Sequence, residues 1–350
     1  MTAARAPLYP LTFQPILKEK VWGGRRLEAL GKLLPAGDGS PPPVGESWEL
    51  ADLDATSASG GGGEAEHSIV AAGPLAGRNI RELIHEYGQD LMGRLETTPD
   101  GGFPILIKYL DASENLSVQV HPSADYVRQH PEAHLKSEAW YIVDAEPEAA
   151  IYKGVKEGVR REQFREAIEN NTVEELLNRV PVKPGDCHYL PSGTCHALGA
   201  GVVVAEVQTP SDTTFRVYDW GRTGRELHIE QAIECIHFGP ADTARFERRT
   251  HVGGMFTTMT RLVNCEYFRI EKVRMSEGYR QAIPYNQPTV WMVLAGAGTI
   301  EPGTGAEPVT FSRGQTLLIP ACMEHAEVEL HQDTVWLEVS FPQAMGDLLA

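Results

Sequence analysis

A pattern of glycine, proline and histidine occurs twice in the chain, about 130 residues apart. "PGDCHYLPSGTCHA" ends at Ala197, and "RGQTLLIPACMEHA" ends at Ala326. In each stretch the proline follows the glycine by six residues and the histidine by eleven, which pairs Gly185 with Gly314, Pro191 with Pro320, and His196 with His325. A turn, a buried strand, a bend at proline and a histidine therefore recur. The repeat predicts two copies of one β-roll, the second truncated and covering about residues 250 to 350.

Most of the remaining chain consists of short β-type runs separated by Gly and Pro turns, for example "TVWMVLAGAGTIEP". Helical apolar spacing is found at residues 79–95 and 161–180, and two asparagines interrupt the second stretch. Residues 35–43 and 55–67 are rich in Pro, Gly and Ser, which predicts surface loops. Many short strands with few helices are typical of a sandwich or barrel, so we expect a mainly β protein.

The charge of the chain limits the class of its partners. The 350 residues include 48 acidic and 31 basic side chains, giving a net charge of -17. Nucleic acids and anionic membrane surfaces attract proteins with basic patches, so neither is an expected partner. An anionic small molecule would need cations concentrated locally around its site.

Cysteine usage and hydropathy favour a cytoplasmic location. The five cysteines are an odd number and form no Cys-x-x-Cys pair, which is typical of reduced thiols. The chain contains no run of 18 or more apolar residues, and its first residues lack the basic and then apolar build of a secretion signal.

The stretch "LSVQVHP" alternates apolar and polar residues as a strand does, which places Gln119 and His121 on one face. Glu138 and His196 are expected on neighbouring strands of the same roll. Two imidazoles, a carboxylate and an amide oxygen suit zinc, with iron, cobalt and manganese as alternatives, and the lack of a thiolate favours an open, catalytic site. The region upstream of His325 offers no matching histidine or acid, so only the first copy can build the site. The alternative is that both histidines are ordinary residues bonded to backbone or water.

Three cations are expected near this metal face. Lys108 interrupts an apolar strand, Lys136 precedes Glu138 by two residues and so shares its face, and Arg216 follows "VQTPSDTTF". A single lysine of this kind is usually explained by its aliphatic stem lying along apolar surface. Three that converge in an acidic chain predict a pocket for a small anion, most simply a phosphate.

Acids and aromatic residues complete the candidate set. Glu206 follows an apolar run on the same alternation as Val204, and it could transfer protons if burial and the metal shift its pKa. A solvated glutamate at a strand end is the alternative reading, as it is for the acids of "GESWEL", Glu46 and Glu49. The tryptophans at positions 22, 48, 140 and 220 could stack on a sugar or fill the core.

Six ordered motifs resemble one enzyme family over nearly the whole chain. They are "VWGG", "GESWEL", "FPILIKYLDASENLSVQVHP", "KSEAWYI", "KPGDCHYLPSGTCHALGAG" and "AEVQTPSDTTFRVYDWGR". Together they are similar to the short bacterial form of type I mannose-6-phosphate isomerase, a cupin-fold family. The resemblance implies two cupin (jelly-roll) β-barrel modules with a small helical segment. The catalytic module would span residues 1–240 with a helical insertion at about 155–180, and a degenerate module would span residues 241–350.

The resemblance also implies roles for individual residues, each named here by its match to a family motif. One Zn2+ per chain would be held by Gln119, His121, Glu138 and His196. Catalytic roles fall on Arg216, which is essential for turnover in the family, and on Lys136 and Glu206, between which the proton-transfer group stays open. Substrate-binding roles fall on Lys108, Ser117, Glu46 and Arg222.

The expected reaction is the interconversion of mannose 6-phosphate and fructose 6-phosphate through an enediol, by a monomer or homodimer whose partner is a small-molecule sugar phosphate. Two alternatives remain at this point. One is a sugar-phosphate sensor that binds without turnover, and the other is an iron-dependent cupin dioxygenase with two histidines and a carboxylate as ligands.

Overall fold

Most of the regular secondary structure consists of strands, as the sequence predicts. The computed structural model describes residues 5–36, 41–57, 63–130, 133–239 and 243–342. Within them a six-stranded antiparallel sheet has the order β11 (Cys187–Leu190), β8 (Glu138–Ala145), β13 (Val202–Gln208), β6 (Leu106–Ala112), β3 (Val44–Leu50) and β2 (Ile16–Gly24). A five-stranded sheet has the order β10 (Leu177–Pro181), β9 (Ala150–Val155), β12 (His196–Leu198), β7 (Val118–Val120) and β14 (Phe215–Tyr218). These two sheets hold the predicted site residues.

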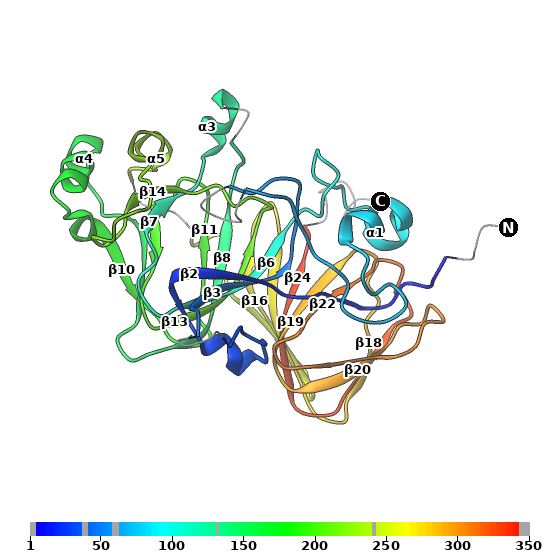
Figure 1. Cartoon of the computed structure of the whole chain (residues 1–350). Coiled ribbons are helices and arrows are strands. Elements are labelled where there is room, and N and C mark those ends of the chain that lie inside the picture. The colour runs from blue at the N-terminus through cyan, green and yellow to red at the C-terminus, as the bar shows by residue number, and fades with distance from the viewer. Residues whose placement is uncertain (1–4, 37–40, 58–62, 131–132, 240–242, 343–350) are drawn as a thin grey trace.

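The carboxyl-terminal part of the chain forms two further sheets, shown in yellow to red in Figure 1. The seven-stranded sheet has the order β1 (Leu11–Thr12), β22 (Thr316–Ile319), β19 (Thr289–Ala295), β24 (Thr334–Ser340), β17 (Arg269–Met275), β16 (Thr257–Asn264) and β15 (Thr250–Gly253). The four-stranded sheet has the order β18 (Arg280–Ala282), β23 (Glu327–Leu330), β20 (Ala297–Glu301) and β21 (Val309–Ser312). The amino-terminal strand β1 thus belongs to a sheet built mainly from the carboxyl-terminal part, a pairing that the predicted boundary near residue 240 does not anticipate.

The order of strands repeats between the two parts. In the first, β11, β8, β13 and β6 are successive neighbours, and in the second β22, β19, β24 and β17 follow the same order. The repeated glycine Gly185 lies two residues before β11, and Gly314 lies two residues before β22. This correspondence supports the prediction of two related modules, while the boundary between them stays a prediction.

Alternation along β13 divides its side chains between two environments. Val203, Ala205 and Val207 belong to a large apolar core that also contains Val293 and Leu337 of the carboxyl-terminal part. On the opposite face Glu206 lines the pocket described below. The same sheet therefore joins the two parts of the chain through one face and builds the site with the other.

Helices are few and short. They are α1 (Ile80–Tyr87), α2 (Gln89–Met92), α3 (Ala124–Gln129), α4 (Arg161–Glu169) and α5 (Ile229–Cys235), with 3-10 helices η1 (Arg26–Leu30) and η2 (Val173–Leu176). Helices α3, α4 and α5 lie at the end of the molecule where β7, β10 and β14 are found (Figure 1). Among the described residues, no helix has both the length and the apolar character needed to cross a membrane.

Two local predictions differ from the structure. The stretch 161–180 is helical in α4 and η2, with the interruption at Asn171, which takes a left-handed conformation (φ 57°), but its last residues form β10, which pairs with β9. The predicted loop at 55–67 ends in a short strand, β5 (Glu66–His67), which pairs with β4 (Asp52–Leu53). The parts of the two predicted loops at 37–40 and 58–62 lie outside the described residues.

The repeated glycines differ in their surroundings, which gives a test of the packing. Both have a positive φ, 95° for Gly185 and 85° for Gly314. A Cβ at Gly314 would lie 1.8 Å from the carbonyl oxygen of Leu30, whereas a Cβ at Gly185 would have no neighbour within 4 Å. We expect Gly185→Ala to cost only the left-handed conformation, about 1–2 kcal/mol, and Gly314→Ala to cost clearly more because η1 must move. Urea unfolding of both variants measures the difference, and equal losses would contradict the close packing of Gly314 on η1.

Candidate metal and sugar-phosphate site

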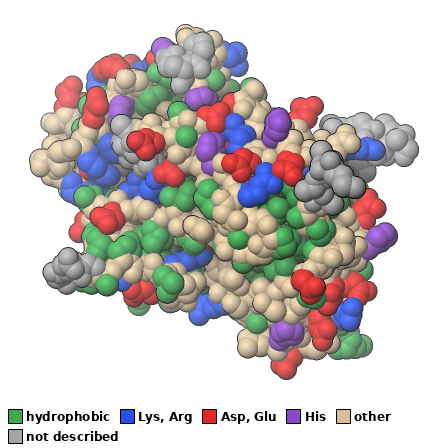
Figure 2. Space-filling view, turned by 45° about the vertical axis from the view of Figure 1, so that its right-hand side comes forward, with side chains coloured by type: hydrophobic (Ala, Val, Ile, Leu, Met, Phe, Trp, Pro, Cys, Tyr) green, Lys and Arg blue, Asp and Glu red, His purple; other side chains and the backbone are tan. Residues whose placement is uncertain are grey.

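A pocket lies between the six-stranded and five-stranded sheets. Its lining includes seven of the residues predicted from sequence, namely Glu46, Lys108, Ser117, Gln119, Lys136, Glu206 and Arg216. On the face of the molecule shown in Figure 2, the acidic side chains occur in separate groups, interspersed with Lys and Arg. The pocket, by contrast, brings several cations together in one place, as an anionic ligand requires.

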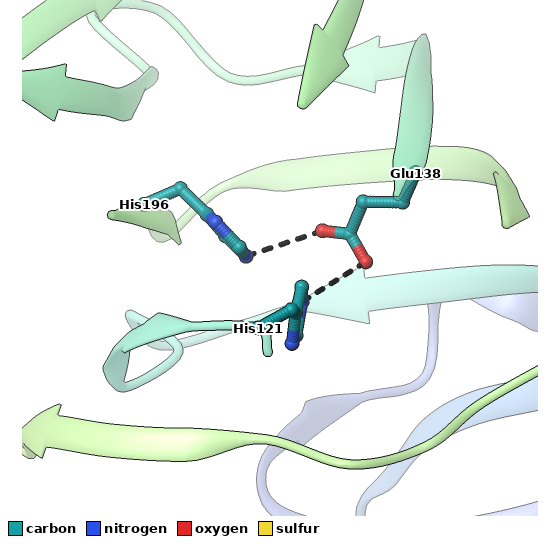
Figure 3. Close-up of side chains that lie close together, drawn as sticks. All are labelled: His121, Glu138 and His196. Atoms are coloured by element: carbon teal, nitrogen blue, oxygen red, sulfur yellow. Dashed lines mark ion pairs between the residues drawn. The ribbon is translucent and has the colours of Figure 1, made fainter. Parts of the chain in front are cut away.

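Three buried residues meet beside the pocket. His121 directly follows β7, Glu138 begins β8 and His196 begins β12, and their ligand atoms all lie within 4.8 Å of one another. Nε2 of His121 is 3.3 Å from Oε2 of Glu138, and Nε2 of His196 is 3.2 Å from Oε1 of the same carboxylate (Figure 3). None of the three side chains is more than 1% exposed. The structure therefore confirms that these three predicted ligands come together.

The strands that supply the three residues differ in part from the prediction. His196 pairs in register with Gln119, so β12 and β7 are neighbours in the five-stranded sheet, as expected. Glu138 was expected on a neighbouring strand but comes from the six-stranded sheet, across the sandwich. The site therefore bridges two sheets.

Hydrogen bonds orient the two imidazoles for metal binding. Nδ1 of His121 lies 3.0 Å from the carbonyl oxygen of Thr213, and Nδ1 of His196 lies 2.7 Å from that of Thr194. Because a carbonyl oxygen only accepts, each Nδ1 carries the proton and each Nε2 presents its lone pair to the centre. Nε2 of His121 and Oε1 of Glu138 are buried and receive no hydrogen bond, and Oε2 of Glu138 forms an ion pair with Lys136. A divalent cation would satisfy these atoms, so the residues present fit a metal ion.

The electrostatics of His121 and Glu138 also suit a metal ion. Burial, with Lys136 as the next cause, lowers the pKa of His121 to about 3, so the imidazole is neutral at pH 7. Burial opposes ionisation of Glu138, but Lys136 and the two imidazoles outweigh it and hold its pKa well below the usual value. Nζ of Lys136 lies 2.9 Å from Oε2 of Glu138. Neutral imidazoles and an ionised carboxylate are the forms that coordinate metals.

Gln119 lies beside these residues, and its amide nitrogen rather than its amide oxygen faces His196. Its Nε2 is 3.4 Å from Nε2 of His196, and its Oε1 accepts a hydrogen bond from the hydroxyl of Ser117 at 3.3 Å. Coordination by the amide oxygen would require the reverse orientation of the amide. Its role as a fourth ligand stays a prediction.

Glu206 lies in the middle of β13 and is 2% exposed, so it is not a solvated residue at a strand end. Its Oε2 accepts a hydrogen bond from Nε1 of Trp140 at 2.8 Å, and its Oε1 lies 3.5 Å from Nζ of Lys108 without a hydrogen bond. Burial is the largest cause that raises the pKa of this carboxyl group, and the charge of Glu138 adds to it. A buried carboxyl group with a raised pKa is a candidate for proton transfer.

Lys108 links Glu206 to a second acid. Its Nζ is also 3.5 Å from Oε2 of Glu46, which accepts a hydrogen bond from Nε1 of Trp48 at 2.7 Å. Burial opposes ionisation of Glu46, but Lys108 and then Lys20 outweigh it and lower its pKa to about 2. Glu49 lies elsewhere, in a buried ion pair with Lys32 (2.6 Å). Of the acids in "GESWEL", only Glu46 lines the pocket.

Arg216 lines the pocket and is 4% exposed. Its Nη1 donates to the carbonyl oxygen of Glu226 (2.7 Å), and its Nε donates to the hydroxyl of Ser117 (3.3 Å). None of the ion pairs among the described residues includes Arg216, and the nearby carboxylate of Asp219 pairs with Arg222 and Arg225 instead. Burial lowers its pKa, followed by the repulsion of Arg225. A buried guanidinium held by neutral groups is well placed to receive an anion.

Arg222 lies outside the lining of the pocket. Its guanidinium contacts the carboxylates of Asp219 (2.8 Å) and Glu114 (3.1 Å) and the carbonyl oxygen of Asn115. Arg225 lines the pocket in its place and is also bound to Asp219. The position of Arg222 does not support its assignment to the substrate, which stays a prediction.

Sequence reasoning did not assign four further polar residues of the lining, which are Lys20, Asp212, Thr214 and Arg225. Lys20 could have been found, since it precedes Trp22 by two residues and strand alternation puts both on one face. Trp22, Trp48 and Trp140 line the pocket, whereas Trp220 donates its Nε1 to the carbonyl oxygen of Leu116 and lies outside the lining.

Comparisons with known proteins agree with this geometry. The family model for phosphomannose isomerase type I, catalytic domain, matches residues 11–158. A mannose-6-phosphate isomerase of Bacillus subtilis is 34% identical over 334 residues, covering 93% of this chain and 98% of that protein. The chain belongs to the type I phosphomannose isomerase family. It is thus an isomerase of a metal-dependent family, and the assignment does not favour the sensor or the dioxygenase.

Other members of the type I phosphomannose isomerase family support the same assignment. The mannose-6-phosphate isomerase of Streptococcus mutans is 35% identical over 319 residues, covering 89% of this chain and 92% of that one. The crystal structure of the mannose 6-phosphate isomerase from Bacillus subtilis superposes with a TM-score of 0.82 at 28% identity, covering 95% of this chain and all of that one. A mannose 6-phosphate isomerase bound with zinc and yttrium shares the fold, with a TM-score of 0.68 at 14% identity and coverage of 95% and 100%. The predicted family and the mainly β, cupin-type fold are therefore confirmed.

Proposed function

We propose that the chain is a zinc-dependent aldose-ketose isomerase that interconverts mannose 6-phosphate and fructose 6-phosphate through an enediol. The observation that carries the proposal is the buried group of His121, Glu138 and His196, whose unsatisfied ligand atoms adjoin a pocket lined by cations. Two imidazoles and a carboxylate suit zinc, and a mannose 6-phosphate isomerase of the same fold binds zinc. Gln119 lies beside His196 and is the proposed fourth ligand, with its amide in the reverse orientation.

When bound, the metal supplies Lewis-acid stabilisation of the negative charge that develops on the substrate oxygen. The side chains of the pocket provide further charge stabilisation and bind the phosphate. Arg216, held in place by Ser117, stabilises the same oxygen charge by a charge-assisted hydrogen bond. The phosphate lies among the cations of the pocket, Lys108 and Lys20 among them, because these charges attract a dianion.

Proton transfer falls to Glu206 in this scheme. The isomerisation removes a proton from C2 of the aldose and returns it to C1 of the enediol, so one group must accept the proton and give it back. Glu206 has a raised pKa and one oxygen without a hydrogen bond, whereas the ammonium of Lys136 lies against Glu138. Lys136 then contributes positive charge beside the substrate oxygens.

We also propose that the enzyme acts in the cytoplasm. All five cysteines are free, four of them buried and Cys322 exposed, which is typical of proteins in a reducing compartment. Every residue given a role belongs to one chain, so either a monomer or a homodimer would serve.

A coupled assay of fructose 6-phosphate formation from mannose 6-phosphate tests the proposal. The full chain is assayed as purified, after chelation, and after addition of Zn2+ or Fe2+. We expect turnover that chelation abolishes and Zn2+ restores. Restoration by Fe2+ alone would contradict the zinc assignment. Absence of turnover with zinc bound and mannose 6-phosphate binding would instead identify a sensor.

A further inference from the structure

Trp140 connects two groups of the site. Its Nε1 donates a hydrogen bond to Oε2 of Glu206 at 2.8 Å, and its ring meets the His196 ring edge to face, with centroids 5.3 Å apart and an interplanar angle of 81°. Trp140 is 1% exposed and Glu206 is 2% exposed. The two residues are also directly opposite each other on β8 and β13. Their contact is therefore fixed by the sheet as well as by the side chains.

The hydrogen bond from Trp140 distinguishes the two oxygens of Glu206. The last torsion of a glutamate side chain is soft, so a carboxylate without a fixed partner samples many orientations. Here Oε2 is held by the indole, and Oε1, which receives no hydrogen bond, is left beside Lys108 in the lining of the pocket. The oxygen without a hydrogen bond is the one available to the substrate.

We propose that Trp140 is a positioning residue for the isomerisation, because its indole N–H holds Glu206 so that one carboxylate oxygen stays available for proton transfer. The inference rests on the proposed function, which gives the proton transfer to Glu206. Trp140 touches neither the metal nor the reacting carbon atoms in this scheme, and it acts through Glu206.

The second half of the chain places a tryptophan opposite a glutamate in the same register, but its hydrogen bonds differ. Glu338 of β24 lies opposite Trp291 of β19, as Glu206 of β13 lies opposite Trp140 of β8. Oε2 of Glu338 accepts hydrogen bonds from the hydroxyl of Tyr285 (2.5 Å) and from Nε1 of Trp336 (3.3 Å). Nε1 of Trp291 donates instead to the hydroxyl of Tyr285 (3.1 Å), so the tryptophan opposite Glu338 reaches the acid through Tyr285.

The two halves differ on the strand that pairs with the other side of the glutamate strand. There Lys108 of β6 lies opposite Glu206, whereas Glu271 of β17 lies opposite Glu338. Glu271 pairs with Arg261 at 3.1 Å. The only group of metal-ligating side chains in the described residues is that of the first half. The register of tryptophan opposite glutamate therefore recurs in both halves, whereas in the first half the tryptophan donates directly to the acid beside a cation and the metal-ligand group.

Trp140→Phe tests the inference, because it keeps an aromatic ring and removes the N–H donor. A hydrogen bond to a charged group contributes enough that we expect kcat to fall about ten- to hundredfold. The KM for mannose 6-phosphate should change by less than about threefold, since the change affects proton transfer rather than uniform binding. Loss of the donor also raises the pKa of Glu206, so the acidic limb of the kcat/KM profile should move to higher pH.

Trp291→Phe is the matched control, since Trp291 is fully buried at the equivalent position and outside the pocket. We expect it to leave kcat unchanged, and thermal unfolding of both variants shows the loss due to packing alone. An unchanged kcat in Trp140→Phe, or a fall that matches a loss of bound metal, would overturn the inference. Lack of mannose 6-phosphate turnover in the unaltered chain would refute the proposed function instead.

Discussion

His121→Ala is expected to lose the metal and abolish isomerase activity while the chain stays folded. The imidazole supplies one of three converging ligands, and two remaining ligands hold a divalent ion far more weakly. Removal of the ring also leaves the Glu138 carboxylate without its neighbour at 3.3 Å. The free energy of unfolding, compared between metal-free proteins so that metal binding does not contribute, should fall by about 1–3 kcal/mol. Metal analysis after dialysis, activity and urea unfolding measure the three effects.

His325→Ala is the matched control for this experiment. His325 occupies the position of His196 in the repeated pattern, but it is exposed and belongs to the part of the chain without the other ligands. The variant should keep its metal and its activity. If His121→Ala retained one equivalent of zinc per chain, the ligand assignment would be wrong.

Strand alternation predicted which side chains of a strand share a face, but not which strands face each other. It placed Gln119 with His121 and Lys136 with Glu138. In the structure Gln119 and Lys136 do lie beside the group of metal-ligating residues that contains His121 and Glu138. The partner of a strand across a sandwich depends on the whole topology, so Glu138 was expected on a strand next to that of His196 and lies in the opposite sheet. Local spacing carries no information about that choice.

The arginines after β14 show a second limit of prediction from residue spacing. Arg222 and Arg225 both follow the same strand, and nothing in their spacing indicates which of them reaches the pocket. Both bind Asp219, and the path of the turn decides that Arg225 lines the pocket. Likewise, the correspondence of Glu206 with Glu338 was not visible in the sequence. It appears only when residues are compared by their partners across each sheet.

Arg216→Ala is expected to lower turnover by at least about a hundredfold, the loss typical of removing a donor to a developing oxyanion. The fold and the metal should be retained, because the guanidinium contacts Ser117 and the carbonyl oxygen of Glu226 but none of the three ligands of the metal group. Steady-state kinetics at saturating mannose 6-phosphate, with metal analysis of the same sample, measures the effect.

The division of the Arg216→Ala effect between kcat and KM identifies what the guanidinium binds. A fall in kcat with little change in KM means that Arg216 acts on charge that develops during the reaction, whereas a raised KM with unchanged kcat means that it holds the phosphate equally throughout. Arg274→Ala is the control, since Arg274 is exposed and paired with Asp333 far along the chain from the site residues. We expect the first pattern, because Arg216 is buried next to Gln119, with which it pairs in register, and so lies on the metal side of the pocket. Near-normal kcat and KM in Arg216→Ala would remove this residue from the mechanism and leave Lys136 as the cation beside the metal ligands.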